Sequence, residues 1–247
     1  MTTGQKPEFS IITVVRNSVD TIENCVKSVK SQTHKDYEYI VIDGLSDDGT
    51  SEIILNYLDS INVYLREKDA GIYDAMNKAL TLCSGKYIGI INADDSYLPD
   101  TLSNVHRVFT DFPNAQVVYG GVQIVSEKGG LLFIDHLNLD NYMIAHPSCF
   151  VSAEVYRNFG KFNSNFKIAA DYDFMLRIRN AGVTFKNSGL VLANYRPGGA
   201  SAKYRFVSIK EMINIQAYHL GWSSLYRKYK FCRHILATYL RNFIRAN

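Results

Sequence analysis

Short apolar runs alternate with amphipathic segments over the first part of this chain. Four runs have the composition and the flanking turn residues of strands: 9–16, 37–43, 62–66 and 87–91. Between the first two, Ile22, Val26 and Val29 fall at three- and four-residue spacing, which predicts an amphipathic helix. Similar segments follow the other strands. This order predicts a β-α-β-α-β-α-β unit, and its short loops favour a mostly parallel, Rossmann-like sheet with helices on both faces.

The pattern after residue 98 is more mixed. It predicts, in order, a helix over 101–112, a hairpin of 115–125 with 131–134, a strand over 146–151, a helix that continues to 179, and a strand over 190–195. We therefore expect one α/β body over residues 1–202, with a first half of about 8–98 and a second half of about 99–202. Its 47% apolar and 21% charged residues are typical of a globular protein.

The segment 203–247 differs from the body in charge. It carries nine Lys or Arg residues and one acid, Glu211, although the whole chain has a net charge of only +3. Apolar and aromatic residues recur in it at mixed three and four spacing, which predicts basic amphipathic helices lying at an anionic membrane surface. The alternative is that these helices pack on the body. Binding of nucleic acid by the tail is a weaker interpretation, and we expect none.

Targeting and redox features point to the cytoplasm. No secretory signal pattern opens the sequence, and no apolar run approaches the ~20 residues of a membrane-spanning helix. The four cysteines are scattered without a close pair, as expected for reduced thiols. We expect a cytoplasmic protein, peripheral at the inner face of the membrane. The sequence leaves a homodimer open.

Polar side chains follow three of the predicted strands. Asn17 follows the first, Asp43 ends the second, and Asn92 to Asp95 follow the fourth, with Asp69 on the loop between. The carboxyl ends of parallel strands are where open α/β sheets bind ligands. One such Asp is commonly a helix cap or turn former, but three groups on one edge are less easily explained in that way. Adjacent acids suit Mg²⁺ or Mn²⁺, and a metal-bound diphosphate is the natural ligand. Phosphate-loop and dinucleotide glycine motifs are absent.

Four successive motifs resemble those of glycosyltransferase family two, and most of all its bacterial O-antigen and surface-polysaccharide members. They are Ser10-Ile-Ile-Thr-Val-Val-Arg-Asn17, Ile42-Asp-Gly-Leu-Ser-Asp-Asp-Gly-Thr50, Glu67-Lys-Asp-Ala-Gly-Ile-Tyr-Asp-Ala-Met-Asn-Lys-Ala79 and Tyr87-Ile-Gly-Ile-Ile-Asn-Ala-Asp-Asp95. The resemblance implies the A-type glycosyltransferase fold, a nucleotide-diphospho-sugar donor, a divalent metal and inversion at the anomeric carbon.

The resemblance also implies a donor site. Thr13, Val15 and Asn17 would line the nucleotide pocket, and Asp43 would accept a hydrogen bond from the base, most simply uracil. Asp69, with Lys78 as a weaker candidate, would lie near the nucleoside or the sugar. Asn92-Ala93-Asp94 occupies the place of the family's Asp-x-Asp motif, with Asn92 in place of the first acid. The metal would then rest on Asp94, with Asp95 assisting.

An inverting transfer also needs a base on the acceptor side. Asp171 matches the family's position for this base best and Asp173 second, although Asp171 could simply cap the following helix. His146 could be a further metal ligand or a structural histidine. The loop 196–201 places Arg196 where it could close over the leaving diphosphate, with a plain Pro-Gly turn as the alternative.

These features predict a metal-dependent inverting hexosyltransferase that uses Mn²⁺ or Mg²⁺. The expected donor is a UDP-sugar, with glucose or galactose favoured, and the expected acceptor is an undecaprenyl-diphosphate-linked sugar of O-antigen lipopolysaccharide or another surface polysaccharide. The alternatives are a sugar nucleotidyltransferase and a non-catalytic glycan- or nucleotide-binding subunit. The first should carry a glycine-rich phosphate loop after the first strand, where Arg16 to Ser18 contains no glycine.

Overall fold

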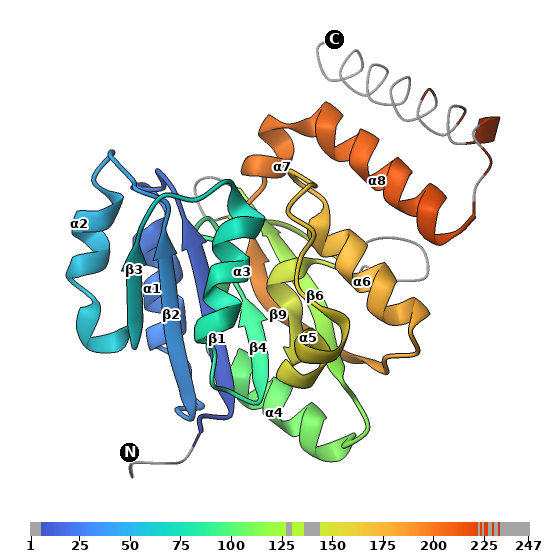
Figure 1. Cartoon of the computed structure of the whole chain (residues 1–247). Helices are drawn as coiled ribbons and strands as arrows, with labels where there is room; N and C mark the ends of the chain where they lie inside the picture. The colour runs from blue at the N-terminus through green and yellow to red at the C-terminus, as the bar shows by residue number, and fades with distance from the viewer. Residues whose placement is uncertain are drawn as a thin grey trace.

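The computed structural model describes residues 6–126, 130–135 and 144–221, together with positions 223, 225, 226, 229 and 232. Its centre is a single mixed sheet with strand order β3-β2-β1-β4-β8-β6-β9-β5, and β7 pairs with β6 outside this path. Helices cover both faces of the sheet (Figure 1). This is the predicted α/β architecture.

The first half of the sheet is parallel, as the sequence predicts. It contains β1 (Phe9–Val15), β2 (Tyr37–Asp43), β3 (Val63–Arg66) and β4 (Tyr87–Ile90). Successive side chains of a strand point to opposite faces, and both faces are buried in β1, in β4 and over most of β2. Ile11 and Val41 accordingly join one hydrophobic core, and Ile12 and Ile42 join the other.

The second half of the sheet mixes the two directions. β8 (Cys149–Ser152) runs antiparallel to β4 and to β6 (Val117–Val125), whereas β9 (Phe185–Tyr195) runs parallel to β6. β7 (Leu131–Asp135) forms the predicted hairpin with β6, and the two-residue β5 (Ser96–Tyr97) pairs with the end of β9. β5 is not predicted from the sequence.

Each helix packs on one face of the sheet through its apolar stripe. α1 (Ile22–Lys30), α2 (Thr50–Leu55) and α4 (Thr101–Asp111) lie against the first core. α3 (Ile72–Leu82), α5 (Ala153–Phe159) and α6 (Ala170–Asn180) lie against the second. Two short 3₁₀ turns complete the body, η1 (Leu58–Ser60) and η2 (His146–Ser148). The predicted strand 146–151 is therefore wrong at its start, because Pro147 lacks the N–H that a ladder needs.

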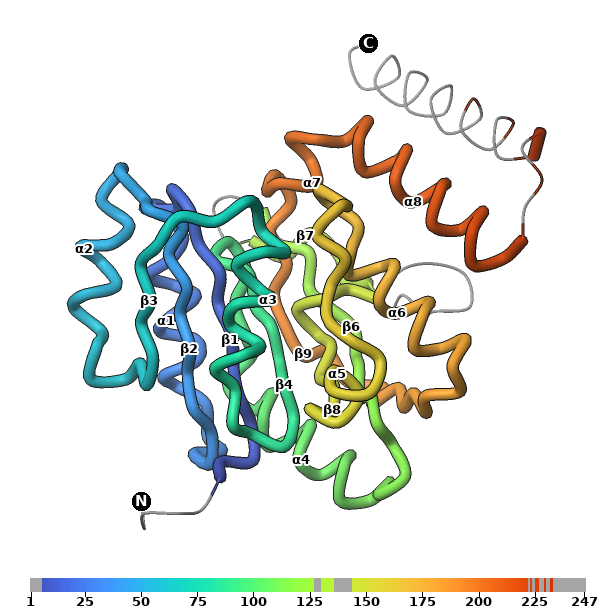
Figure 2. The backbone as a smooth tube through the Cα atoms, viewed as in Figure 1, coloured from blue at the N-terminus to red at the C-terminus, as the bar shows by residue number. Residues whose placement is uncertain are grey.

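The beginning of the basic tail packs on the body. α7 (Ala200–Lys203) and α8 (Arg205–His219) follow β9, and Ile215 of α8 is buried against Tyr172 and Leu176 of α6. Figure 2 shows α8 alongside α6 at one end of the molecule. Most of the predicted tail after 221 lies outside the described residues. Within the described part of the chain, no helix combines the length and the apolar character that crossing a membrane requires.

Candidate functional site

A cavity of about 800 Å³ opens at the carboxyl ends of β1 and β4. Its walls come from both halves of the body and from the segment that begins the tail. The first half contributes Val15, Asn17 and Asp69, and the second half contributes His146 and Asp171. The predicted site residues therefore meet at the expected edge of the sheet, although not all of them reach the cavity.

The loop after β1 forms the floor at one end of the cavity. Asn17 adopts a left-handed conformation with φ of 53°, which Asn tolerates better than most residues. Its backbone N–H donates to Ser46 Oγ at 3.0 Å, and its side-chain Oδ1 accepts from the N–H of Asp47 at 3.0 Å. These bonds fix the loop after β2 beside the end of β1, and Val15 and Asn17 line the cavity as predicted.

Two predicted nucleotide contacts lie in the interior instead. Thr13 is fully buried and its Oγ1 accepts from the hydroxyl of Tyr39 at 2.9 Å. Asp43 is also fully buried, and its carboxylate accepts from Ser46 N–H at 2.8 Å, from Tyr64 at 3.1 Å and from Ser51. Both side chains are engaged in hydrogen bonds within the protein interior. This corrects the prediction that they face the nucleotide.

Asp69 lies on the cavity wall, and Lys78 does not. The Oδ1 atom of Asp69 accepts from Gly71 N–H at 2.9 Å, and its other oxygen lies so close to Gly44 that a β-carbon there would clash. Lys78 instead donates to the Lys68 carbonyl at 2.7 Å and pairs with Glu67 at 2.8 Å. The prediction that Lys78 reaches the donor is corrected by these contacts, because they hold its ammonium on the outer loop.

Asp94 and Asp95 follow β4 but face in different directions. The Asp94 carboxylate lines the cavity and lies against Gly199, where a β-carbon would clash with it. Asp95 is buried and accepts from the backbone N–H of Arg196 at 3.1 Å. Burial raises the pKa of Asp94 against the opposing charge of Arg196, and burial together with the Asp94 charge raises the pKa of Asp95.

The segment from Asn92 to Asp95 has the chemistry of a divalent-cation site. A buried carboxylate, Asp95, adjoins a half-buried one, Asp94, and the Oδ1 atom of Asn92 is buried without a hydrogen-bond partner in the described part of the chain. Oxygen donors with uncompensated negative charge are what Mg²⁺ and Mn²⁺ bind. Asp94 is the carboxylate exposed to the cavity, and Asn92 and Ala93 line the cavity beside it.

His146 does not lie with the carboxylates of Asp94 and Asp95. Its buried ring packs edge-on against Phe162 and interacts electrostatically with Asp171, and burial lowers its pKa. Among the residues that the structure describes, Asp94, Asp95 and His146 do not bring three ligand atoms within 4.8 Å of one another. The structure therefore does not bring His146 together with the two aspartates as a group of three ligands.

Asp171 stands in the first turn of α6, inside the cavity. Its Oδ1 atom accepts from the hydroxyl of Tyr73 at 2.8 Å and from Tyr172 N–H at 2.9 Å. Burial raises its pKa, against the opposing effects of His146 and Tyr73. The helix is capped at Ala169, so Asp171 is not its N-cap residue. A carboxylate with a raised pKa that faces a cavity is a candidate general base.

Asp173, the alternative base, points away from the cavity. It lies 3.0 Å from Nε2 of His219 on α8, and 4.0 Å from Nε of Arg177. Asp173 was the second candidate for the base, and the structure does not place it in the described cavity lining. Arg196 also differs from its prediction, because the described cavity lining does not include it and its backbone binds Asp95.

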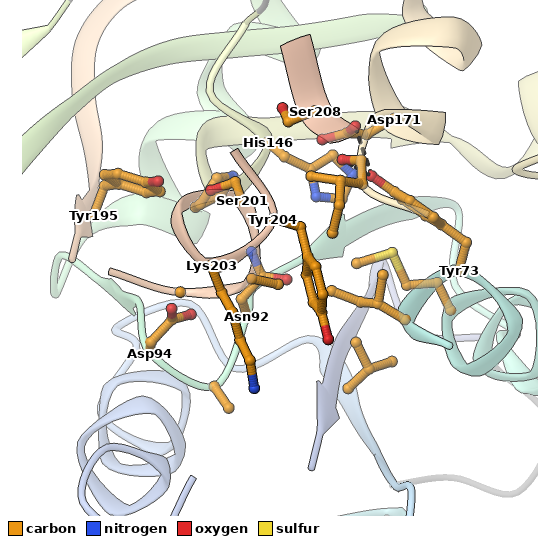
Figure 3. Close-up of a pocket in the computed structure, with 18 of the residues that line it drawn as sticks. Tyr73, Asn92, Asp94, His146, Asp171, Tyr195, Ser201, Lys203, Tyr204 and Ser208 are labelled. Atoms are coloured by element: carbon orange, nitrogen blue, oxygen red, sulfur yellow. Dashed lines mark hydrogen bonds between the residues drawn. The ribbon is translucent and has the colours of Figure 1, made fainter. Parts of the chain in front are cut away.

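The segment 198–208, which joins the end of the predicted body to the start of the predicted tail at residue 203, supplies a further cavity wall. Lys203, Tyr204 and Ser208 line the cavity, together with Ser201. Figure 3 shows Lys203 and Tyr204 between Asp94 on one side and Asp171 with His146 on the other. No spacing in the sequence distinguishes Lys203 from the other cations of the tail, so only the fold of the chain reveals it.

Comparison with known proteins gives consistent results. The model of glycosyl transferase family 2 matches residues 10–174. A protein of Mycobacterium tuberculosis described as a PGL/p-HBAD biosynthesis glycosyltransferase is 31% identical over 201 residues, which cover 78% of each chain. An uncharacterized glycosyltransferase of Rickettsia felis is 27% identical over 80% of this chain and 36% of its own.

Solved structures share the fold. Residues 1–349 of S. aureus TarS in complex with UDP-GlcNAc superpose with a TM-score of 0.73 at 16% identity, over 92% of this chain and 71% of that one. The mannosyltransferase PcManGT of Pyrobaculum calidifontis, in complex with GDP-Man and Mn²⁺, gives 0.69 at 17% identity, over 90% and 66%. These likenesses extend to the architecture of the sheet and its helices, which is the predicted A-type fold.

Proposed function

This chain belongs to glycosyltransferase family 2, and we propose that it is an inverting enzyme that transfers a hexose from a UDP-sugar to a lipid-diphosphate-linked glycan. The observation that carries the proposal is the pair of carboxylates in one cavity, Asp94 at one side and Asp171 at the other. The donor sugar would lie in the cavity between these carboxylates, beside Lys203 and Tyr204, with the donor held by the first half of the sheet and the acceptor entering over the second.

The donor would bind beside β1 and β4. Its nucleoside would rest against Val15 and Asn17, with Asp69 near the ribose or the sugar. The diphosphate would lie toward Asp94 and Lys203, which both line the cavity, and the Lys203 ammonium group would supply a positive charge to it. Asp94, with the Asn92 amide, would hold Mn²⁺ or Mg²⁺, which when bound offsets the charge of the leaving diphosphate.

Asp171 would act as the general base. As the acceptor hydroxyl oxygen forms its bond to the anomeric carbon, the bond from that carbon to the diphosphate oxygen breaks, and the hydroxyl proton passes to Asp171. Attack from the face opposite the leaving group inverts the configuration. The Tyr73 hydroxyl and the Tyr172 N–H hold the carboxylate in position. UDP leaves toward Lys203.

The acceptor side supports a lipid-linked substrate. Strand β7 ends at the cavity with Asp135, and its four apolar residues before Asp135 are between 45% and 59% exposed: Leu131, Leu132, Phe133 and Ile134. Figure 2 places β7 and α7 at the same end of the molecule. An exposed apolar strand beside basic residues of α7 and α8, such as Lys203, Arg205 and Lys210, suits an anionic lipid surface. We therefore place the protein at the inner face of the cytoplasmic membrane, with an undecaprenyl-diphosphate-linked sugar as acceptor.

The biological setting that we propose is the synthesis of a bacterial surface glycan. The Mycobacterium relative is described as acting in PGL/p-HBAD biosynthesis, and the sequence motifs resemble those of O-antigen enzymes. The sugar nucleotidyltransferase alternative is disfavoured by the family, and a non-catalytic role is disfavoured by Asp171, which has the environment of a base.

The test is a donor screen with the purified chain. Each of UDP-glucose, UDP-galactose, UDP-GlcNAc and GDP-mannose is incubated with Mn²⁺ and a GlcNAc- or GalNAc-diphospho-lipid, and products are identified by mass spectrometry. We expect one hexose to be added from a UDP-hexose, with a β-linkage from an α-linked donor by NMR. Addition only from GDP-mannose would contradict the donor assignment, and a product that retains the donor configuration would contradict inversion.

A further inference from the structure

A second group of ligand-type side chains lies far from the sugar-transfer cavity. Glu8 precedes β1, His34 lies on the loop between α1 and β2, and His106 lies on α4. Among the described residues, these three form the one group of three metal-ligating side chains whose ligand atoms all lie within 4.8 Å of one another. The proposed transfer reaction uses none of them.

The spacing of these atoms is already close to that of ligands around one ion. His34 Nε2 lies 3.0 Å from Glu8 Oε2, and His106 Nδ1 lies 2.8 Å from Glu8 Oε1. Ligands at about 2.0–2.1 Å from a tetrahedral zinc ion are separated from one another by roughly 3.3 Å. Small side-chain movements would therefore convert the group into a coordination shell without moving the backbone.

One nitrogen in the group makes an ion-pair contact but no hydrogen bond. His34 Nε2 is buried and lies 3.0 Å from Glu8 Oε2, yet it forms no hydrogen bond within the described part of the chain. Phe9 packs edge-on against the ring, with centroids 5.3 Å apart, and His106 stacks on it at 5.1 Å. The ring is thus held in place with a buried nitrogen that touches the Glu8 carboxylate without a hydrogen bond, and an ion bound between the two groups would complete this contact.

We propose that Glu8, His34 and His106 bind a single transition-metal ion, with Zn²⁺ preferred. Two imidazoles and one carboxylate are a common zinc ligand set, and imidazole favours zinc over the magnesium or manganese of an all-oxygen site. The ion would be separate from the one proposed at Asp94. Glu8 lies before the first residue of β1, whereas the cavity lies at the strand's far end, about 20 Å away at strand rise.

The site would act as a structural clamp. Its ligands come from three segments that are far apart in the sequence, so they come together only in the folded chain. In Figure 1 the beginning of β1 and α4 lie at the end of the molecule opposite α7. Zinc binding there would stabilise the folded state by mass action and leave the transfer chemistry unchanged.

Zinc titration of the purified full chain tests the proposal. Metal-free protein is titrated against a chromophoric zinc chelator in excess Mg²⁺, which occupies oxygen sites but competes weakly for imidazole. All proteins carry Cys232→Ser, because that exposed thiol also binds zinc. The variants are Glu8→Gln and His106→Gln, and the matched control is Arg107→Gln, an exposed neighbour on α4. Thermal unfolding is measured with and without Zn²⁺.

We expect one tight zinc site per chain that is weakened about 100-fold or more in both ligand variants and unchanged in the control. Zinc should raise the unfolding temperature of the parent and control proteins only. Equal zinc affinity in all four proteins would overturn the proposal, as would a parent protein with no tight site. Transferase activity is measured in parallel, and its loss or retention does not bear on the zinc result.

Discussion

Glu211 of α8 holds the loop that presents Asp171. Its carboxylate accepts from three successive backbone N–H groups, those of Lys167 at 2.8 Å, Ile168 at 2.9 Å and Ala169 at 3.1 Å. This loop enters α6, where Asp171 lies in the first turn. We therefore predict that Glu211→Ala impairs catalysis even though Glu211 does not line the cavity. Glu211 is a positioning residue rather than a catalytic one.

The expected size of the effect follows from the three hydrogen bonds. The bond to Lys167 is exposed and contributes little, because water replaces the carboxylate there. The bonds to Ile168 and Ala169 are partly buried, and hydrogen bonds to a charged group contribute about 1.5–3 kcal/mol each when buried. Discounted for partial exposure, their loss costs about 2–4 kcal/mol of loop order. Tyr73 still holds Asp171, so we expect kcat to fall about tenfold to a hundredfold.

The assay separates positioning from folding. Steady-state transfer is measured for Glu211→Ala, for Glu211→Gln, which keeps one acceptor oxygen, and for Asn214→Ala, an exposed control on the same helix. We expect kcat to fall in Glu211→Ala and to recover partly in Glu211→Gln. The Kd for UDP should stay within about twofold, because the donor side is untouched. An unchanged kcat, or a fall in UDP affinity as large as the fall in kcat, would refute the reasoning.

Three further predictions concern single residues of the site. Asp171→Asn should lower kcat by about 10²–10⁴-fold. Burial raises the folded-state pKa of Asp171, so the ionised carboxylate destabilises the folded parent protein at neutral pH. Asp171→Asn should therefore unfold at a higher temperature than the parent at pH 7, and this difference should vanish below about pH 4. A lower unfolding temperature for the variant at pH 7 would contradict this prediction. Lys203→Ala should lower kcat/KM about tenfold or more by loss of a charged contact to the diphosphate, whereas Lys35→Ala, at an exposed lysine outside the cavity and the proposed lipid surface, should not; equal effects would place the diphosphate elsewhere. Asp43→Asn should lower the urea midpoint of unfolding with little change in UDP affinity, and the reverse result would restore Asp43 as a base-binding residue.

The strands of the first half were predictable because they are buried on both faces. An apolar, β-branched run such as β1 or β2 has few alternatives, and the structure places both within one residue of the predicted ends. Strand β5 was not predictable, since two residues carry no periodicity. The seven-residue α5 spans only about two helical turns, too few for a clear apolar periodicity. Pro147 turned the start of a predicted strand into a 3₁₀ turn.

The site was predictable where a residue's place in the chain fixes its place in space. Asp94 directly follows a central strand, so it reaches the carboxyl edge of the sheet. The sequence alone does not decide whether Asp171 or Asp173 faces the cavity. Residues two apart on a helix face different directions, so only one of them can do so. Which one does depends on the rotation of α6, and that is set by the packing of residues such as Phe174. Lys203 was hidden for a similar reason, since its position depends on how α7 returns over the cavity.

The central claim is that one cavity binds the donor at Asp94 and activates the acceptor at Asp171. The most direct test measures UDP affinity in Mn²⁺ and glycolipid formation on the same preparations of the parent, Asp94→Ala and Asp171→Asn proteins. We predict that Asp94→Ala loses both UDP affinity and transfer, whereas Asp171→Asn keeps UDP affinity within about twofold and loses transfer by about 10²-fold or more. Transfer at the parental rate by Asp171→Asn, or parental transfer by Asp94→Ala, would contradict the account.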